Sequence, residues 1–115
     1  MKLEQGDIIW LDLNPAKGTE TQKKRPCLIV SNDNYNRIFN TVITVPISTA
    51  KKYLTEEKYL KSPMFIKIDK DNIHGTALLQ QARAVDPRQR IGGKLETKLS
   101  SLEMKSISKV LSQFY

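Results

Sequence analysis

The apolar residues of this chain fall into short runs that turn-forming residues separate. Such runs occupy residues 8–13, 26–30, 41–47 and 63–68, and Gly, Pro, Asn or Asp lie close to their ends. β-branched residues, which are common in these runs, favour strands, whereas Gly, Pro, Asn and Asp favour turns. The pattern therefore predicts short strands joined by turns over most of the chain.

The remaining central segments are less regular. Residues 75–80 and 82–85 predict one or two further strands, and residues 86–93 predict a basic loop. Residues 33–39 predict a short helical turn, and residues 69–72 a turn. The polar stretch 49–62 predicts a mobile connection with room for one helical turn, and a connection of this length is often functional.

The period of the apolar residues changes near the C-terminus. The apolar residues here recur at helical spacing: Leu99, Leu102, Ile107, Val110, Leu111 and Phe114. Ser100 and Glu103 fit a capping box, in which each side chain satisfies an unpaired backbone amide of the other residue. Leu99 and Met104 can add a hydrophobic staple. A helix over about 101–113 is predicted.

These elements together predict a mainly β fold with a C-terminal helix. The chain has 115 residues, which suits one domain spanning 1–115. Short, closely spaced strands favour a small antiparallel β-barrel, and closure of the barrel would remove exposed strand edges. The helix would pack on the sheet.

The charge of the chain points to acidic partners. There are 19 Lys and Arg residues against 12 Asp and Glu, a formal net charge of +7. Such a balance suits nucleic acid or an acidic protein, and charge alone does not separate the two. We predict a cytoplasmic protein without a membrane partner, because no signal peptide or membrane-length apolar run is present. The single cysteine, Cys27, is predicted to be a buried core residue.

A basic loop leads to Arg25-Pro26 at the entrance of a predicted strand. Proline fixes its own φ and favours an extended residue before it, so Arg25 is expected at a rigid position, where its guanidinium suits a phosphate. A second polar group, Ser48-Thr49, follows the strand at 41–47. Taken separately, a solvated loop and a strand-end cap explain these residues better than a binding site does. If the two strands pair, Arg25 and Ser48 meet on one rim.

The sequence predicts neither a metal site nor a bound cofactor. His74 is the only histidine, and Cys, His and carboxylate residues do not cluster at ligand spacing. No glycine-rich phosphate loop precedes a helix. With one histidine, the sequence does not indicate a Ser-His-Asp catalytic triad.

At this point the chain resembles the MazF/PemK-type toxins of type II toxin–antitoxin systems. The resemblance rests on several short segments in the family's order, and it covers nearly the whole chain. These segments are Gly6-Asp7-Ile8-Ile9-Trp10, Pro15, Gly18-Thr19-Glu20, Arg25-Pro26, Val45-Pro46-Ile47-Ser48-Thr49, residues 75–85 with Gln81 and Arg83, and residues 88–93.

The resemblance implies a fold, an activity and partners. It implies an SH3-like β-barrel of the MazF and CcdB toxin type, and a homodimer. The implied activity is that of a metal-independent endoribonuclease that cleaves single-stranded RNA. The implied partner is a cognate acidic antitoxin, which would fold across the basic rim, and the toxin–antitoxin complex would bind DNA.

Residue by residue, the resemblance assigns the key arginine to Arg25 and the key hydroxyl to Ser48, where several relatives have threonine. Thr49 is the neighbouring hydroxyl, and Glu20 matches the family's acidic loop residue. The Kid branch uses an Arg and an Asp where this chain has Leu78 and Gln80, so the MazF pattern is the better model. The predicted RNA-binding residues are Lys17, Thr19, Lys24, Arg37, Lys51, Lys52, Gln81 and Arg83.

Three alternative functions stay open at this stage. The chain could bind RNA without cutting it, although it lacks a regular aromatic platform. It could instead poison gyrase as CcdB does, or be a toxin that has lost activity and still binds its antitoxin. Arg25-Pro26 together with Ser48-Thr49 favours the ribonuclease.

Overall fold

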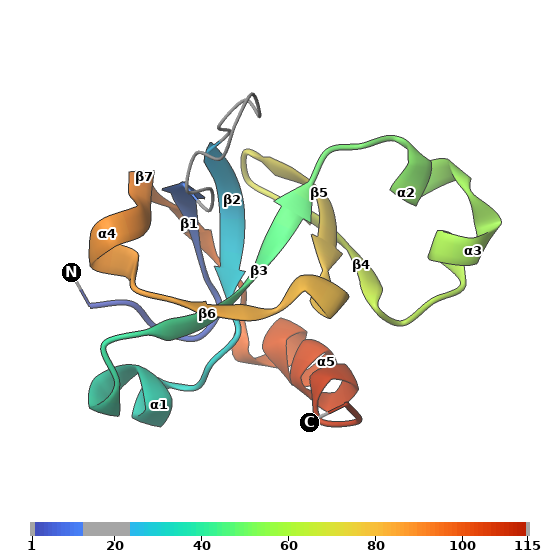
Figure 1. The fold of residues 1–115 in the computed structure, drawn as a ribbon. Helices are drawn as coiled ribbons and strands as arrows, with labels where there is room; N and C mark the ends of the chain where they lie inside the picture. The colour runs from blue at the N-terminus through green and yellow to red at the C-terminus, as the bar shows by residue number, and fades with distance from the viewer. Residues whose placement is uncertain (1, 13–23, 115) are drawn as a thin grey trace, which may run out of the picture.

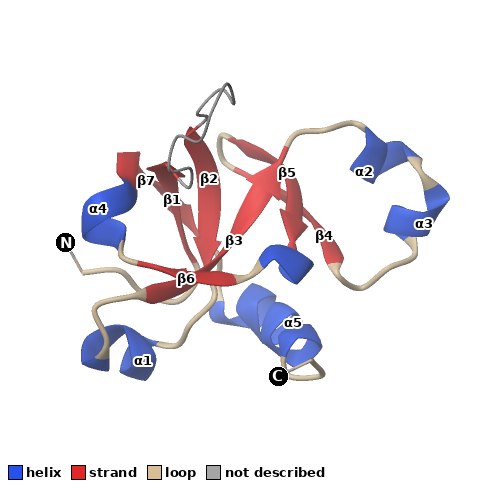
Figure 2. Ribbon diagram, viewed as in Figure 1, coloured by secondary structure: helices blue, strands red, loops and turns tan. Residues whose placement is uncertain are grey.

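Seven short strands form the sheet of this molecule, and the computed structural model describes residues 2–12 and 24–114 (Figures 1 and 2). The strands are β1 (Asp7–Asp12), β2 (Lys24–Ile29), β3 (Val42–Ser48), β4 (Phe65–Lys70), β5 (Ile73–Leu78), β6 (Arg83–Val85) and β7 (Ile91–Lys98). The helices are α1 (Asp33–Ile38), α2 (Lys52–Thr55), α3 (Glu57–Leu60), the 3₁₀ turn η1 (Leu79–Gln81), α4 (Pro87–Arg90) and α5 (Ser101–Leu111).

The sheet is antiparallel and curled into a half-barrel. Its strand order is β4-β5-β3-β2-β1-β7, and β6 pairs with β3. The prediction of a mainly β fold with a C-terminal helix is confirmed. The predicted closure is wrong, because β4 and β7 stand at opposite ends of this order in the described part of the chain. Charged side chains such as Lys67, Asp69 and Lys70 on β4 suit an open edge.

Both faces of the sheet carry a hydrophobic core. One face packs against α5, and its buried residues include Ile8, Leu28, Val45, Ile47, Ala77, Met104, Ile107 and Leu111. The other face, here called the far face, buries Leu3, Ile9, Leu11, Cys27, Ile29, Val42 and Val85. Because side chains alternate along a strand, β2 and β3 contribute to both cores. This confirms that the strand predicted at 41–47 is buried on both faces.

Helix α5 begins with the predicted capping box. The Ser100 hydroxyl accepts a hydrogen bond from the Glu103 backbone N–H at 3.1 Å, and the Ser100 N–H donates to Glu103 Oε1 at 2.8 Å. Leu99 and Met104 are both buried in the core on this face. The helix ends at Leu111, two residues before the predicted end. None of the helices within 2–12 and 24–114 is long and apolar enough to cross a membrane.

The connection between β3 and β4, predicted as polar chain with one helical turn, contains α2 and α3. We call residues 51–62 the arm, and Figure 1 shows it extending beyond β4 and β5. Tyr53 from α2 and Tyr59 from α3 lie 4.8 Å apart between ring centroids, and Phe65 of β4 lies 5.4 Å and 4.8 Å from them. Aromatic pairs at these separations attract one another. The three rings therefore attach the arm to the edge of the sheet.

The largest error of the sequence prediction concerns the segment after β6. Residues 86–93 were expected to form a basic loop, whereas the structure has α4 followed by β7. β7 is mostly exposed and pairs with β1 through two register shifts, so its sequence lacks a regular alternation. Gly92 and Gly93, which were included in the expected loop, lie in β7 and allow the close approach of Lys24 and Trp10.

The hairpin between β4 and β5 is tighter than predicted. β4 runs to Lys70, so the turn expected at 69–72 shrinks to Asp71 and Asn72. Asp71 has φ = 52°, a left-handed conformation that Asp tolerates better than most residues. The hairpin places β5 beside β3, where Ile47 pairs with Ala77 and Ser48 pairs with Thr76.

Gly75 lies at the close contact between β5 and the end of β3. A Cβ atom at this position would lie 2.6 Å from the Ser48 carbonyl oxygen and 2.9 Å from Ile47 Cγ2. Such a contact cannot be relieved by rotating a long side chain, because the nearest atom belongs to the backbone. Gly75 therefore allows β5 to reach the strand end that carries Ser48.

We predict that Gly75→Ala lowers the free energy of unfolding by about 1–3 kcal/mol, the usual cost of forced overpacking. Gly92→Ala is the matched control, because its Cβ would meet the flexible side chain of Lys24 at 2.8 Å. Urea denaturation measures both variants. Equal stability of Gly75→Ala and wild type would contradict the strand contact described here.

The free energy of unfolding at acidic pH is expected to depend on Glu103. The hydrogen bond from Lys70 Nζ, followed by that from the Ser100 N–H, lowers the pKa of Glu103 to about 2 from 4.5. Since the folded-state pKa is lowered, the stabilisation is present above about pH 4.5 and is lost as the pH falls toward 2. Solvent screening reduces its size, because the Glu103 side chain is 46% exposed.

Glu103→Gln should therefore flatten the fall in stability between pH 4.5 and 2, measured as urea midpoints across that range. Glu57→Gln is the control, since Glu57 begins the exposed helix α3 and pairs with Lys61 directly after that helix. If Glu103→Gln kept the wild-type pH dependence, the pairing with Lys70 would not contribute to acid stability.

Candidate functional site

Arg25 and Ser48 lie at the same end of the β2–β3 pair. The two strands are antiparallel, and Cys27 pairs with Pro46. Continuing this register by two residues brings Arg25 across from Ser48. The last recorded pair is Cys27 with Pro46, and Figure 1 shows the strands diverging beyond it. The condition that these two strands pair is met, and it leaves Arg25 and Ser48 on neighbouring strands at the end where the pair widens.

Both side chains belong to the far face of the sheet. In an antiparallel pair, residues directly across from each other point to the same side. Cys27 is in the far-face core, so Arg25 and Ser48, each two residues from the Cys27–Pro46 pair, share that side. Arg25 is exposed, whereas Ser48 is 6% exposed. The guanidinium is therefore accessible to a ligand while the hydroxyl is held in place by its surroundings.

Cys27 confirms its predicted role as a core residue. It is fully buried, and burial raises the pKa of its thiol to about 12. The positive charges of Arg25 and then Arg83 oppose this shift without overcoming it. Both arginines therefore act on the same far-face region. A thiol with this pKa stays protonated near neutral pH and cannot serve as a nucleophile.

The Ser48 hydroxyl is oriented by the backbone that follows β3. Its oxygen accepts a hydrogen bond from the Ala50 N–H at 3.2 Å. The hydroxyl proton remains available to donate to a ligand. Thr49 is exposed, and in the described part of the chain its side chain makes no hydrogen bond. Of the two hydroxyls, Ser48 is the one with a fixed position.

The next strand adds a residue that the sequence analysis did not single out. Thr76 of β5 lies directly across from Ser48 and is 2% exposed. Its hydroxyl has no hydrogen-bond partner. Among the buried side chains of the described residues, the Thr44 hydroxyl also lacks a partner. A buried hydroxyl without a partner is rare in proteins. Only the register between β3 and β5 reveals this position, and the sequence gives no register.

The predicted RNA-binding residues are distributed unevenly around this site. Lys24 is exposed at the start of β2 beside Arg25, and Lys51 and Lys52 are exposed at the start of the arm, soon after Ser48. Gln81 is exposed in η1. Arg83 on β6 lies across from Thr44 of β3. Lys17, Thr19 and Glu20 lie outside the described residues.

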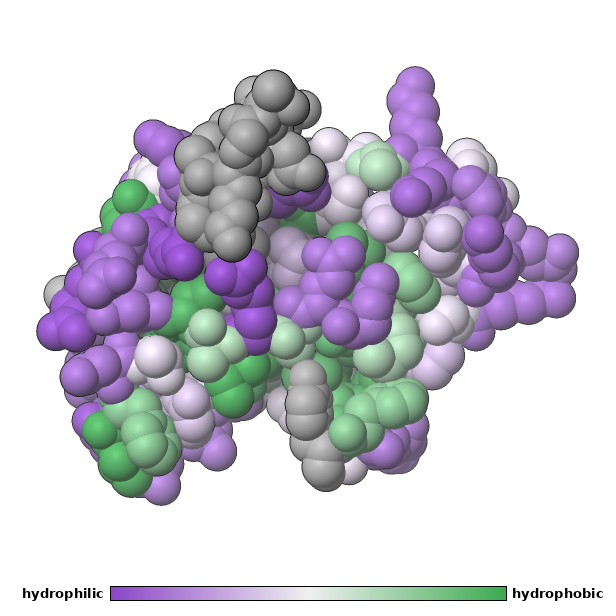
Figure 3. Space-filling model, viewed as in Figure 1, coloured by the Kyte–Doolittle hydropathy of each residue, from purple (hydrophilic) through white to green (hydrophobic). Residues whose placement is uncertain are grey.

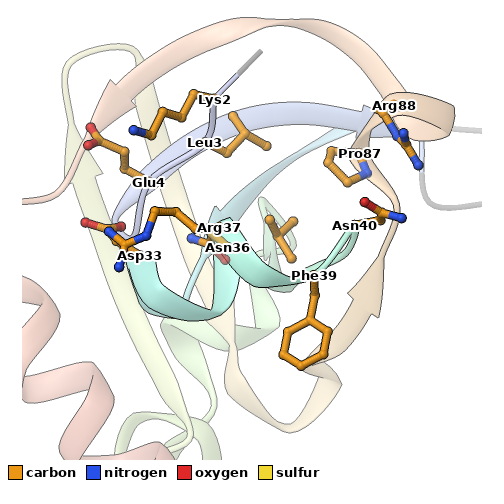
Figure 4. A pocket seen from close by; sticks show the side chains of 11 residues that line it. Lys2, Leu3, Glu4, Asp33, Asn36, Arg37, Phe39, Asn40, Pro87 and Arg88 are labelled. Carbon is orange, nitrogen blue, oxygen red and sulfur yellow. The ribbon is translucent and has the colours of Figure 1, made fainter.

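Arg37 is remote from Arg25 and Ser48. It belongs to α1, which precedes the opposite end of β3, about 20 Å from Ser48 at 3.3 Å per residue. Arg37 lines a cavity of about 680 Å³ together with Asp33, and Arg88 lies at the other end of it (Figure 4). Arg88 pairs with Asp86 at 3.0 Å. Carboxylates accompany the arginines here, which makes this cavity a poor phosphate site.

An apolar cavity of about 490 Å³ lies between α1, β6 and α5. Its lining includes Val30, Tyr35, Ile43, Ala82, Ala84 and Leu111. Figure 3 shows apolar side chains gathered on the face between α1 and α5. Over the described ranges, no group of three or more His, Cys, Asp and Glu side chains could hold a metal ion.

Comparison with known proteins connects this geometry to a family. Residues 4–115 match the family model described as PemK-like, MazF-like toxin of type II toxin–antitoxin system. The curated Endoribonuclease MazF of Staphylococcus saprophyticus is 34% identical over 112 residues, which cover 95% of this chain and 88% of that protein.

Solved structures confirm the fold. MazF (Form-I) of Deinococcus radiodurans superposes with a TM-score of 0.74 at 19% identity, covering 98% of this chain and 96% of that one. MazE-MazF (Form-II) of the same organism gives 0.77 at 19% identity, covering 98% and 95%. An endoribonuclease in complex with its cognate antitoxin from Mycobacterial species gives 0.68 at 19% identity, covering 97% and 91%. The chain belongs to the PemK-like, MazF-like toxin family of type II toxin–antitoxin systems.

Proposed function

We propose that this toxin is a metal-independent, sequence-specific endoribonuclease that cleaves single-stranded mRNA. The observation that carries the proposal is that Arg25 and Ser48 lie on one face at the diverging end of the β2–β3 pair, each two residues beyond the Cys27–Pro46 pair. A guanidinium and an oriented hydroxyl on one rim suit the oxygens of a phosphodiester. The curated relative named as an endoribonuclease supports the same activity.

The proposed reaction uses the RNA's own nucleophile. The 2′-OH attacks the adjacent phosphorus, the new O2′–P bond forms, and the P–O5′ bond breaks. The products are a 2′,3′-cyclic phosphate and a 5′-OH end, so the 2′ proton must leave and the 5′ oxygen must gain one. No metal is needed to generate the nucleophile, because the substrate supplies it.

Each residue of the site has a distinct role in this proposal. Arg25 stabilises the negative charge that develops on the non-bridging oxygens, because a guanidinium keeps its positive charge and is a poor general base. Ser48 donates its hydroxyl proton to a phosphate oxygen while the Ala50 N–H fixes its oxygen. Thr49 is the alternative hydroxyl. We assign Glu20, which lies outside the described residues, to orienting Arg25, with acceptance of the 2′ proton as the second choice.

The surrounding basic residues would guide the RNA chain. Lys24 precedes Arg25, and Lys51 and Lys52 follow Ser48 by a few residues. Gln81 and Arg83 lie on the opposite edge of β3 from β2, where β5 and β6 pair. Bases extended across this surface can be recognised through their edges, which is the usual basis of sequence-specific binding to single-stranded RNA.

The same surface suits an acidic antitoxin. The net charge of +7 favours an acidic chain, and a disordered inhibitor can fold as it covers a site. Two of the similar structures are complexes with MazE or a cognate antitoxin. We place this toxin and its antitoxin in the cytoplasm, where mRNA is available.

We further propose a homodimer in which the second copy covers the apolar cavity between α1 and α5. Ile38 at the end of α1 and Phe39 directly after it are 64% and 53% exposed, and they extend the apolar surface. Arg83 already lines this cavity, so Ala84→Arg would add a second, bulky positive charge beside it and should give a monomer in light scattering. Lys61→Gln on the arm should remain dimeric. A dimeric Ala84→Arg variant would contradict this interface.

The central test is cleavage of a long single-stranded RNA by purified protein in excess EDTA, followed by mapping of the ends. We predict discrete cuts with 5′-OH ends. Arg25→Ala should lose about 10²–10³ in rate, the usual cost of removing one preorganised donor. Ser48→Ala should lose more activity than Thr49→Val, because Ser48 has the fixed hydroxyl. Arg88→Ala, which removes an arginine paired with Asp86, is the control.

The outcomes separate the candidate functions. Intact RNA with wild-type protein, folded and free of antitoxin, would overturn the ribonuclease. RNA binding without cuts would then indicate a binding module, and arrested gyrase would indicate a CcdB-like poison. Full activity of Arg25→Ala would remove Arg25 from its assigned role while leaving the activity itself established.

A further inference from the structure

A row of polar residues continues from Ser48 across two more strands. Ser48 pairs with Thr76 of β5, and Thr76 pairs with Lys67 of β4. Because residues directly across from each other share a face, all three side chains point to the far face. Neighbouring strands lie about 4.8 Å apart, so the backbone of Lys67 is about 10 Å from that of Ser48. Arg25 stands across from Ser48 at the other end of this row.

The hydroxyl of Thr76 lacks a partner at the centre of this row. It is buried and makes no hydrogen bond, although the Ser48 hydroxyl next to it already accepts from the Ala50 N–H. A buried polar group without a partner calls for an explanation, which a bound group can provide. Val would fill the same space without this cost, so packing alone does not account for a threonine.

Lys67 brings a positive charge that no carboxylate among the described residues pairs with. It is exposed and, like most lysines in the described ranges, forms no ion pair; Lys70 on the same strand pairs with Glu103. The nearest acid along the same face of β4 is Asp69, two residues on, and it is hydrogen-bonded to His74 across the hairpin. The ammonium group of Lys67 is therefore free to bind an anion.

We propose that Thr76 and Lys67 bind the RNA phosphate next to the one that is cut. This inference rests on the proposed ribonuclease function, with the scissile phosphate between Arg25 and Ser48. The row would then hold two consecutive phosphates, one at Ser48 and one toward Lys67. Thr76 donates its hydroxyl proton to the second phosphate, and Lys67 supplies the charge that neutralises it. Both act as positioning residues, which hold the chain in register with the reacting atoms.

Two variants test the site, and each has a matched control. Thr76→Val should raise KM for RNA on the order of tenfold, as expected for loss of a hydrogen bond to a charged group. Thr44→Val removes the other unpartnered buried hydroxyl and should leave KM unchanged. Both valine variants should fold at least as stably as wild type in thermal denaturation, because each removes an unsatisfied group.

Lys67→Gln should weaken RNA binding at low salt and lower the slope of log K against log salt by about 0.7, the contribution of one neutralised phosphate in a single strand. Lys109→Gln, on the exposed side of α5, is the control for loss of a lysine. The slope separates a direct phosphate contact from a change in folding, which would lower affinity equally at all salt concentrations.

A substituted RNA locates the contact. In a short RNA around the mapped cut, one flanking linkage at a time is replaced by an uncharged methylphosphonate. The wild type should bind one of these RNAs several-fold more weakly, and Lys67→Gln should bind that RNA and the unmodified RNA alike. If the wild type cuts RNA but neither Thr76→Val nor Lys67→Gln differs from its control, this inference fails while the ribonuclease stands. Weakened binding of an acidic peptide alone, with RNA binding unchanged, would also overturn it.

Discussion

The pairing of β2 with β3 is the interaction on which the site depends. It is a ladder of backbone hydrogen bonds whose register puts Cys27 across from Pro46. Arg25 and Ser48 each lie two residues beyond that pair, on the same face. A slip by one residue would turn Arg25 to the opposite face of the sheet, away from the side that Ser48 occupies. The fully buried Cys27, Leu28 and Ile29 prevent such a slip, since each fits one face only. The two cores thus fix the position of the polar rim.

Much of this arrangement was predictable from local signals. Arg25-Pro26 and the β-branched run ending at Ser48 mark strands that lie within one or two residues of their observed bounds. The Ser100–Glu103 capping box was equally clear, because a helix start depends on neighbouring residues. Such features follow from chemistry over a few positions. The pairing of their two strands, considered from the sequence as a condition, is observed, whereas the roles that the family resemblance assigns to Arg25 and Ser48 stay predictions.

Features that depend on non-local contacts were not predictable. β7 is held by β1 through shifted pairs, and its glycines accommodate Lys24 and Trp10. Thr76 and Lys67 become neighbours of Ser48 only through the registers of two ladders. Arg37, basic and close to the motif in sequence, lies at the other end of β3. Sequence distance is a poor guide to a surface that a curled sheet assembles from several strands.

The burial of Cys27 has one more consequence. A thiol reagent can reach this sulfur only when β2 separates from its neighbours, and the thiolate it needs is suppressed in the folded state. Because the chain has a single cysteine, every labelled molecule records one opening of the strand that carries Arg25. The protein thus contains its own reporter of local unfolding at the proposed site, and a bound RNA or inhibitor would be registered as slower labelling of a residue it never touches.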